Sequence, residues 1–177
     1  SRGNIWIGLQ DFSLSCYERQ RATFQNFFFE KKEGEGAARE GFVMSMCEDR
    51  RGRLWRADFY SGISVYDPLQ NKFIRTAAKQ GTGNRPLESI RTLARDSLGR
   101  MWAGSFKHGL FTFDTLQRRW ASYQSNDTSL GGNTIKEIVV AHDGVIWVAT
   151  WGGGLKRIDP VSGAVTTLRA HPGARPE

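Results

Sequence analysis

Residues 99–105 read GRMWAGS, and similar short segments occur four times along the chain. This recurrence is the strongest indication of the fold in the sequence. The other copies are GNIWIGL at residues 3–9, GRLWRAD at 52–58 and GVIWVAT at 144–150. Successive central tryptophans lie 49, 47 and 45 residues apart, and they are Trp6, Trp55, Trp102 and Trp147. Self-similarity at a nearly constant period is the signature of a repeat protein.

Further positions recur at fixed distances from each tryptophan. A glycine lies three residues before it in every copy, at Gly3, Gly52, Gly99 and Gly144. Another glycine lies seven residues after it in the last three copies, at Gly62, Gly109 and Gly154, and Ser13 takes this place in the first. Large apolar residues follow at eleven and eighteen residues, and an acid follows at twelve. All variation in the period falls in the link that precedes the next repeat, so the remainder is expected to be a packed unit.

Each repeat predicts four short strands. In the third copy, residues 89–96, 100–106, 109–114 and 118–123 are rich in β-branched and aromatic residues, and turn-forming Asp, Gly and Ser separate them. No stretch of ten residues has a clean helical stripe. A propeller blade uses four strands in about 40–50 residues. We therefore predict an all-β fold, a partial β-propeller of about four blades, each a four-stranded antiparallel sheet.

The predicted blades cover one continuous propeller fragment. Their approximate bounds are residues 1–29, 42–78, 89–124 and 134–169, with a tail at 170–177. The first blade is incomplete, because the innermost strand before Trp6 is missing. A ring closes with about four to eight blades, so we expect about half a ring. The blade faces left open at Ile5–Trp6 and near the C-terminus are then expected to be covered by the remaining blades of the parent chain, or by a second copy in a homodimer.

The composition is that of a globular domain. The chain has 177 residues, of which 39% are hydrophobic and 24% charged. It has no run of 18 apolar residues, so membrane contact is expected only through flanking segments. Two cysteines, Cys16 and Cys47, exclude a disulfide-stapled scaffold and a cysteine-only zinc site. They are expected to be buried free thiols, because their places on predicted strands fit no pair.

The net charge of +7 would suit an acidic polymer, a nucleic acid or an anionic membrane surface. Lysines and arginines are scattered, however, and acids lie beside the denser groups such as Arg118–Arg119. No nucleic-acid-binding motif accompanies the charge. We therefore expect no nucleic-acid partner.

The motif D-x-x-G-x-[LM]-W-x-[AG], followed by G-[LI]-x-x-[YF]-D-P, resembles the two-component regulator propeller repeat. Residues 49–57 and 62–68 carry it in the second copy, and residues 144–160 give the closest match. The resemblance covers essentially the whole chain. It implies the periplasmic or extracytoplasmic sensor region of a membrane-anchored bacterial receptor, namely a histidine kinase, a hybrid two-component system protein or a diguanylate cyclase. The kinase or cyclase activity would lie outside this chain.

The sequence departs from this repeat at a few positions. Leu9 and Asp58 stand where threonine or serine is usual, and Ser13 replaces a glycine. Arg56 occupies a place that is usually aliphatic. We expect the strand that carries Arg56 to be an edge strand or to lie near solvent.

Nothing in the sequence predicts a catalytic centre. The three histidines, His108, His142 and His171, fall in a hairpin, a turn and the tail. A Ser–His–Asp order, an HExxH motif and a Walker loop are all absent. We therefore expect no catalytic residue, no metal site and no cofactor. The acids Asp67, Asp114 and Asp159 are expected to cap turns, and the repeated tryptophans to pack between sheets.

The best candidate for binding is the face that carries the hairpins. Because strands alternate in direction, the hairpin after the second strand and the variable links fall on one face of the propeller, and loops on a rigid scaffold often bind ligands. The candidate residues on this face are Phe59, Tyr60, Phe106, Lys107, His108 and Trp151. Rings there would pack on the C–H groups of a small molecule or oligosaccharide, and polar neighbours would bind hydroxyls. The alternative is that the rings recur because they pack within the repeat.

Two other functions fit a propeller. Streptogramin-lyase-like enzymes have similar blades, but an active site would need a histidine and an acid on one face in neighbouring blades, and only His108 is expected on the hairpin face. A protein-binding scaffold of WD type is the third possibility, although its Gly-His and Trp-Asp signatures are not in their usual places. Ligand sensing is the function that the sequence favours.

Overall fold

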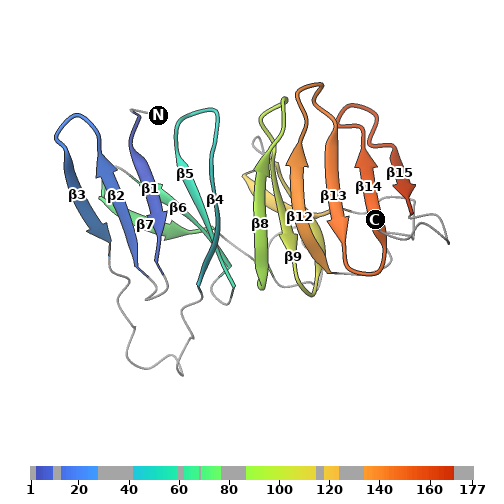
Figure 1. Ribbon diagram of the computed structural model, residues 1–177, viewed down its shortest axis with the longest axis horizontal. Coiled ribbons are helices and arrows are strands. Elements are labelled where there is room, and N and C mark those ends of the chain that lie inside the picture. Colours follow the sequence, from blue (N-terminus) through green and yellow to red (C-terminus); the bar gives the residue numbers. More distant parts are fainter. Residues whose placement is uncertain are drawn as a thin grey trace, which may run out of the picture.

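The computed structural model describes residues 3–9, 13–27, 42–59, 62–67, 69–76, 87–114, 118–123 and 134–169. All regular structure in these ranges is β, in fifteen strands (Figure 1). No helix long and apolar enough to cross a membrane occurs in them.

The strands form one three-stranded and three four-stranded antiparallel sheets. Blade 1 consists of β1 (Ile5–Gly8), β2 (Leu14–Glu18) and β3 (Thr23–Phe27). Blade 2 consists of β4 (Val43–Glu48), β5 (Leu54–Asp58), β6 (Gly62–Asp67) and β7 (Lys72–Arg75). Blade 3 consists of β8 (Ile90–Arg95), β9 (Met101–Ser105), β10 (Gly109–Asp114) and β11 (Arg119–Ser122). Blade 4 consists of β12 (Ile135–Val140), β13 (Ile146–Thr150), β14 (Gly154–Ile158) and β15 (Val165–Leu168).

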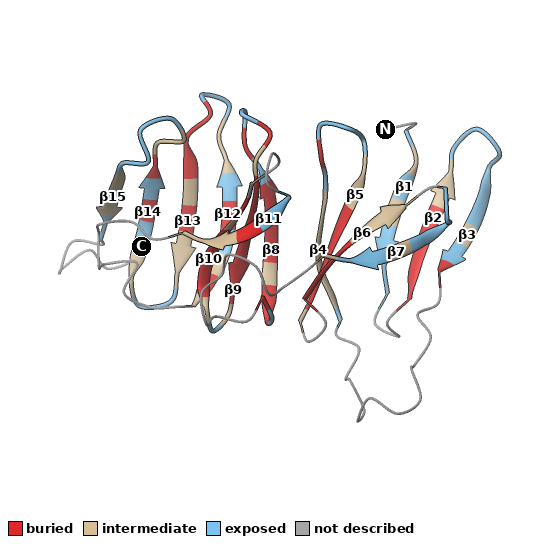
Figure 2. Ribbon diagram, turned by 180° about the vertical axis from the view of Figure 1, so that it is seen from behind, coloured by how far each residue is buried: buried red, intermediate tan, exposed pale blue. Residues whose placement is uncertain are grey.

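The sheets stand side by side and follow chain order, so the predicted partial propeller is confirmed (Figure 1). β4 and β5 pack against β8, and β8 and β9 pack against β12. Buried residues are concentrated in the seams between blades, notably along β5, β8 and β9 (Figure 2). The core is thus three interblade layers rather than one central cluster.

Each of the first three repeated tryptophans packs against the next blade, and the fixed offsets in the sequence identify the residues that it contacts. Trp6 of blade 1 lies 5.2 Å from Tyr66 and 6.2 Å from Phe73 of blade 2, measured between ring centroids. Trp55 lies 4.9 Å from Phe113 and 5.9 Å from Trp120 of blade 3. The partners are always the residues eleven and eighteen positions after the next tryptophan. Ile158 and Val165 hold these two places in the apolar cluster around Trp102.

No blade packs against Trp147 among the described residues, and its environment differs accordingly. Trp55 and Trp102 are each 1% exposed, whereas Trp147 is only half-buried. Its pairing partners place it on the outward face of blade 4, opposite the face that packs on blade 3. Exposed apolar residues share this last end face, namely Val139, Leu155 and Leu168. The outward side of blade 1 forms a first end face with Ile5, Ile7 and Phe24.

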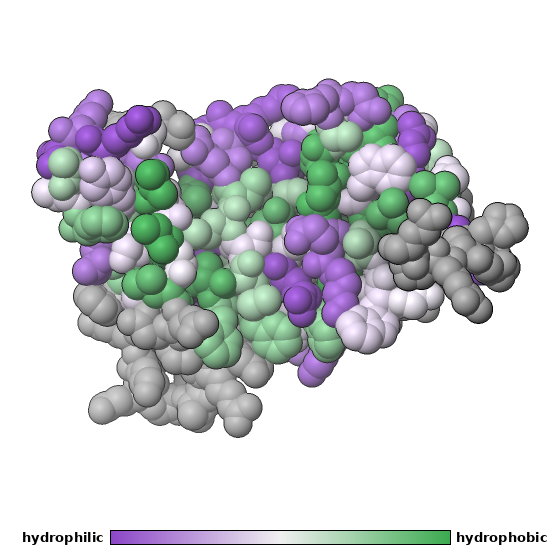
Figure 3. Space-filling view, in the orientation of Figure 1, coloured by the Kyte–Doolittle hydropathy of each residue, from purple (hydrophilic) through white to green (hydrophobic). Residues whose placement is uncertain are grey.

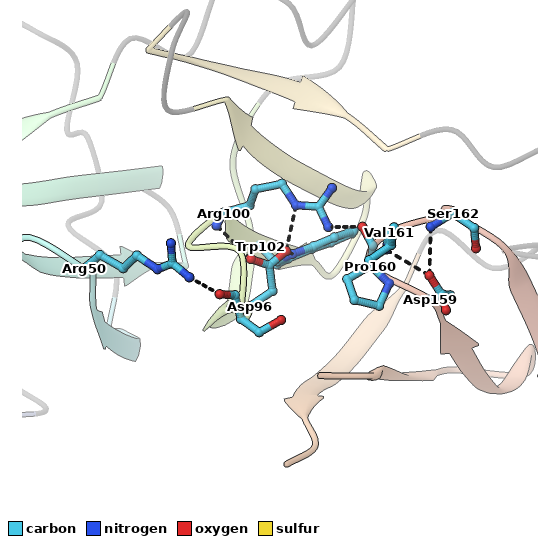
Figure 4. Close-up of polar contacts among 9 residues, drawn as sticks. Arg50, Asp96, Arg100, Trp102, Asp159, Pro160, Val161 and Ser162 are labelled. Atoms are coloured by element: carbon cyan, nitrogen blue, oxygen red, sulfur yellow. Dashed lines mark hydrogen bonds and ion pairs between the residues drawn. The ribbon is translucent and has the colours of Figure 1, made fainter. Parts of the chain in front are cut away.

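The turns after the first and third strands of each blade share one side, which we term the turn face. At this face Asp96 Oδ2 accepts hydrogen bonds from Trp102 Nε1 at 2.9 Å and from Arg100 Nε at 2.7 Å. Arg100 Nη2 donates to the carbonyl of Pro160 in blade 4 at 2.6 Å, and Arg50 of blade 2 donates to the carbonyl of Ser97 (Figure 4). These bonds tie blades 2, 3 and 4 together.

Blade 2 repeats the Asp–Arg–Trp arrangement. Asp49 Oδ2 accepts from Trp55 Nε1 at 2.9 Å and from Arg53 Nε at 2.7 Å. Burial acts to raise the pKa of the Asp49 carboxyl, but hydrogen bonds from Trp55 and Arg53, with the charge of Arg53, outweigh it and leave the pKa below its ordinary value. In blade 4, Ala141 and Val145 replace the acid and the arginine.

The glycines near this motif allow turns that other residues would strain. Gly52, Gly99 and Gly144 adopt φ values of 74°, 85° and 85°. Gly62, Gly109 and Gly154 lie in the same left-handed region, and a side chain at Gly62 would meet the carbonyl oxygen of Leu87 at 2.6 Å. The aspartates at the other turn also act as predicted, since Asp67 accepts from the N–H of Leu69 and Asp159 from that of Val161. The side chain of Asp114 lies outside the described residues.

The expectation for Arg56 was wrong. Its strand, β5, lies between β4 and β6, and the residue is 7% exposed. Arg56 Nη2 donates to Asp58 Oδ2 at 2.6 Å, and its guanidinium lies 5.2 Å from the centroid of the Phe73 ring. The carboxylate of Asp58 therefore compensates the charge of Arg56. Both residues lie in β5, and both differ from the residue that is usual at their place in the repeat. Cys16 and Cys47 are free thiols, Cys16 buried and Cys47 partly so, and burial raises the pKa of both.

Candidate functional site: a row of rings and cations

The hairpins between the second and third strands lie opposite the turn face, at the lower edge in Figure 1. We term this side the hairpin face. The strand register places the end of β3 and the starts of β4, β8 and β12 at the same side. The links between blades therefore leave and enter the sheets at the hairpin face, as the sequence predicted. In Figure 3 hydrophilic residues dominate the upper edge, whereas hydrophobic and hydrophilic residues mix toward the lower one.

One backbone hydrogen bond fixes the hairpin aromatic residue in each complete blade. The N–H of Phe59 donates to the carbonyl of Phe42 at 3.3 Å. In blade 3 the N–H of Phe106 donates to Ser89 at 2.7 Å, and in blade 4 that of Trp151 donates to Thr134 at 3.0 Å. The acceptor is always the residue before the inner strand. The rings therefore recur at one place, beside the start of β4, β8 and β12.

The same inner strands each contain an irregularity in their pairing. The register with the second strand shifts between Val43 and Ser45 in β4, and it shifts at the same place in β8 and β12. A β-bulge inserts one extra residue and re-aims its side chain, and bulges are frequent beside functional sites. The extra residues are Met44, Arg91 and Lys136.

The cations at two of these bulges stack on the hairpin rings. Arg91 Cζ lies 5.9 Å from the centroid of Phe106. Lys136 Nζ lies 3.7 Å from the centroid of Trp151 in its own blade and 5.7 Å from that of Phe106 in the preceding blade. Phe59 extends the line, with its centroid 6.1 Å from Phe106. We call Phe59, Arg91, Phe106, Lys136 and Trp151 the cation–aromatic row.

The row is open to solvent and carries positive charge. Trp151 is 66% exposed, and the other four residues are half-buried. Among the described residues, no ion pair involves Arg91 or Lys136. A platform of rings that hold cations can bind a flat or ring-shaped ligand through its faces, and an acidic group through its charge.

A second polar cluster orders the blade 3 hairpin. Ser105 Oγ accepts from the N–H groups of Lys107 and His108, both at 3.1 Å, and donates to the carbonyl of Glu88 at 2.8 Å. His108 Nε2 lies 3.3 Å from Glu88 Oε1. The side chains of His108 and Glu88 are 22% and 49% exposed, and Lys107 is exposed. The hairpin that carries Phe106 therefore also presents a histidine next to an acid, and an exposed lysine.

Five of the six candidates from the sequence fall in this region, and Tyr60 lies outside the described residues. The structure joins Phe59, Phe106 and Trp151 in one row, and places Lys107 and His108 in the hairpin of Phe106. Sequence reasoning missed Arg91 and Lys136. A signal existed, because both lie eleven residues before a repeated tryptophan, directly after an aliphatic residue that does recur. No group of three potential metal ligands occurs in the part of the chain that is described.

Comparisons with known proteins agree with the fold. No protein-family model matches the sequence, and no curated protein matches it either. The structure is similar to the extracellular domain of a protein described as a hybrid two-component system from B. thetaiotaomicron, with a TM-score of 0.71 and 20% identity. It is also similar to the extracellular domain of a protein described as a one-component system from that bacterium, with a TM-score of 0.74 and 21% identity. These matches cover 93% and 95% of this chain, but only 22% and 24% of the other proteins.

Virginiamycin B lyase from Staphylococcus aureus is a third similar structure. The TM-score is 0.72 at 13% identity, and the match covers 98% of this chain and 54% of the lyase. The chain thus spans a quarter to a half of the proteins it resembles. At these identities the likeness establishes a shared fold, which both signalling domains and an enzyme use.

Proposed function

We propose that this chain is the ligand-sensing part of an extracytoplasmic β-propeller in a bacterial two-component-type receptor. It binds a small molecule or oligosaccharide at the hairpin face and passes a signal to a cytoplasmic output domain, either a histidine kinase or a diguanylate cyclase. The chain itself is a binding module rather than an enzyme. Further blades of the parent chain, or a second copy, complete the assembly, and flanking segments anchor it to the inner membrane.

The observation that carries this proposal is the cation–aromatic row. Three rings from three successive blades lie on the face where the variable links begin and end, Phe59 beside Phe106, and Phe106 connected to Trp151 through Lys136. Their backbones are held by the same hydrogen bond in each blade, so the platform is preorganised. The repeat motif and the likeness to extracellular domains of signalling proteins support the receptor context.

The experiment is a binding assay with the purified protein and a panel of oligosaccharides, followed by calorimetry. We expect F106A and W151A to weaken binding at least about tenfold, because a stacked ring contributes roughly 1–3 kcal/mol. F24A is the matched control, since Phe24 is an exposed ring on the first end face. Equal affinities of F106A, W151A and the unmodified protein would contradict this site.

The His108–Glu88 pair supports a second candidate, a lyase of the streptogramin B type. The sequence offered one histidine on this face, and the structure adds an acid at 3.3 Å, although both belong to one blade. A histidine held by a carboxylate can act as a general base. Turnover of a streptogramin B that H108A abolishes would favour the enzyme, whereas binding without turnover favours the sensor.

A further inference from the structure

We propose that the ligand of the hairpin face is an acidic oligosaccharide, a sugar chain bearing carboxylate or sulfate groups, and that Arg91 and Lys136 bind its acidic groups. This inference rests on the proposed function and narrows it to one ligand class. It follows from where the bulges place the two cations and from what surrounds them.

Both cations lie at β-bulges, where the regular pairing of the inner strand is interrupted. A regular strand would send the second residue of β8 or β12 to one face of its sheet. The bulge releases it from the pairing pattern and lets the side chain lie over the hairpin rings. The same irregularity occurs in three blades, so it belongs to the fold, but only blades 3 and 4 use it for a cation.

The nearby acids are engaged elsewhere. Glu137 follows Lys136 directly, but its Oε1 accepts the hydroxyl of Thr92 at 2.5 Å and the N–H of Ile138 at 3.1 Å. Glu88 lies beside His108. Within the described part of the chain, the charges of Arg91 and Lys136 therefore meet only ring faces, and their remaining N–H donors are available to an anion.

The polarity of the bulge residues changes along the cation–aromatic row. Met44 holds the bulge position in blade 2, Arg91 in blade 3 and Lys136 in blade 4. The end of the row at Phe59 therefore has an apolar bulge residue, whereas both cations lie near Phe106, Arg91 at 5.9 Å and Lys136 at 5.7 Å from its centroid, and Lys136 also stacks on Trp151. A sugar chain laid along the row would place a neutral residue against Phe59 and an acidic residue between Arg91 and Lys136.

The test measures affinity for matched acidic and neutral probes by calorimetry. The acidic probes are a short oligogalacturonate and a sulfated glycosaminoglycan oligosaccharide, and the neutral probe is the oligogalacturonate with its carboxylates reduced to alcohols. We expect at least one acidic probe to bind at least about tenfold more tightly than the neutral one, because hydrogen bonds between charged partners are stronger than those between neutral groups.

Variants separate a specific site from general attraction to a basic protein. R91Q/K136Q is expected to remove the preference for acidic sugars. K72Q/R119Q removes the same amount of charge from exposed positions on the outer strands β7 and β11. This variant is expected to keep the preference for acidic sugars. Thermal unfolding checks that both variants fold. Should R91Q/K136Q fail to fold, the single variants R91Q and K136Q must each weaken binding of the acidic probe and leave binding of the neutral probe unchanged, whereas K72Q and R119Q must not weaken it.

Each outcome is decisive. Preference for an acidic probe that R91Q/K136Q alone removes supports the inference. Equal binding of acidic and neutral probes, or equal losses in both double variants, overturns it while leaving the proposed function intact. Binding of no oligosaccharide in either panel overturns this inference and the oligosaccharide part of the proposed function.

Discussion

At the scale of single residues, Asp96 connects a turn, the core and the next blade. Its side chain is fully buried and accepts hydrogen bonds from the N–H of Arg100, the Arg100 guanidinium and the Trp102 indole. The same guanidinium reaches Pro160 of blade 4. The Asp96 carboxylate therefore orients both the Trp102 ring, which packs on blade 4, and the Arg100 guanidinium, which donates a hydrogen bond to blade 4.

The first stability prediction concerns this carboxylate. D96N keeps one acceptor but turns an amide toward the two donors that now share Oδ2, so we expect a loss of about 3 kcal/mol in the free energy of unfolding. D159N is the control, because the N–H groups of Val161 and Ser162 both donate to Oδ1 of half-buried Asp159, and asparagine retains this acceptor (Figure 4). It should cost less than about 1 kcal/mol. Urea denaturation measures both, and equal losses would refute a special role for Asp96.

At the scale of elements, a small residue two places after each tryptophan sets the distance between blades. Gly8 and Gly104 hold this place in blades 1 and 3, and Ala57 and Ala149 in blades 2 and 4. A Cβ built on Gly104 would meet Cγ2 of Ile135 in β12 at 2.5 Å, and one on Gly8 would meet Val43 in β4 at 3.0 Å. The repeat motif thus contains a spacing requirement: the inner strand of the next blade packs directly on this position.

The second stability prediction follows from that spacing. G104V should destabilise the protein by about 3 kcal/mol, because the new side chain overlaps Ile135 and the blades must separate. A149V introduces the same side chain at the same place in blade 4, on the last end face, against which no described blade packs. It should change the free energy of unfolding by less than about 0.5 kcal/mol. Thermal denaturation of both variants checks this, and a G104V protein as stable as A149V would contradict it.

The sequence predicted the blades well because their rules are periodic. Tryptophans, turn glycines and the residues at eleven and eighteen positions each reflect one contact that is repeated from seam to seam. Of the five residues in the cation–aromatic row, it predicted the three rings but neither cation. The rings recur in sequence and could be found, but Arg91 and Lys136 act through a bulge, which is a property of strand pairing. Arg56 was misplaced because a charged residue in a strand suggests solvent, and only the structure brings Asp58 and Phe73 around it.

At the scale of the whole molecule, the arc has two unequal kinds of apolar surface. Three seams are closed by the contact of one tryptophan with the next blade. The two end faces carry the same kinds of side chain without such cover, with Ile5 55%, Phe24 61% and Val139 55% exposed. Adjacent apolar residues exposed on a sheet face mark an interaction surface. Each end face therefore resembles one half of an interblade contact whose other half is not part of the described structure.

The last prediction is that the isolated protein associates through these faces. Light scattering over a concentration series should show a mass that rises toward a dimer or larger species, since burying apolar surface stabilises by about 25 cal/mol per Å². I7K and L155K each place a charge on one end face and should lower the association, whereas V161K, at an exposed turn residue away from both faces, should not. If the mass equals one folded monomer at every concentration, the end faces are stable in water, and no covering partner is needed to explain how the arc stays folded.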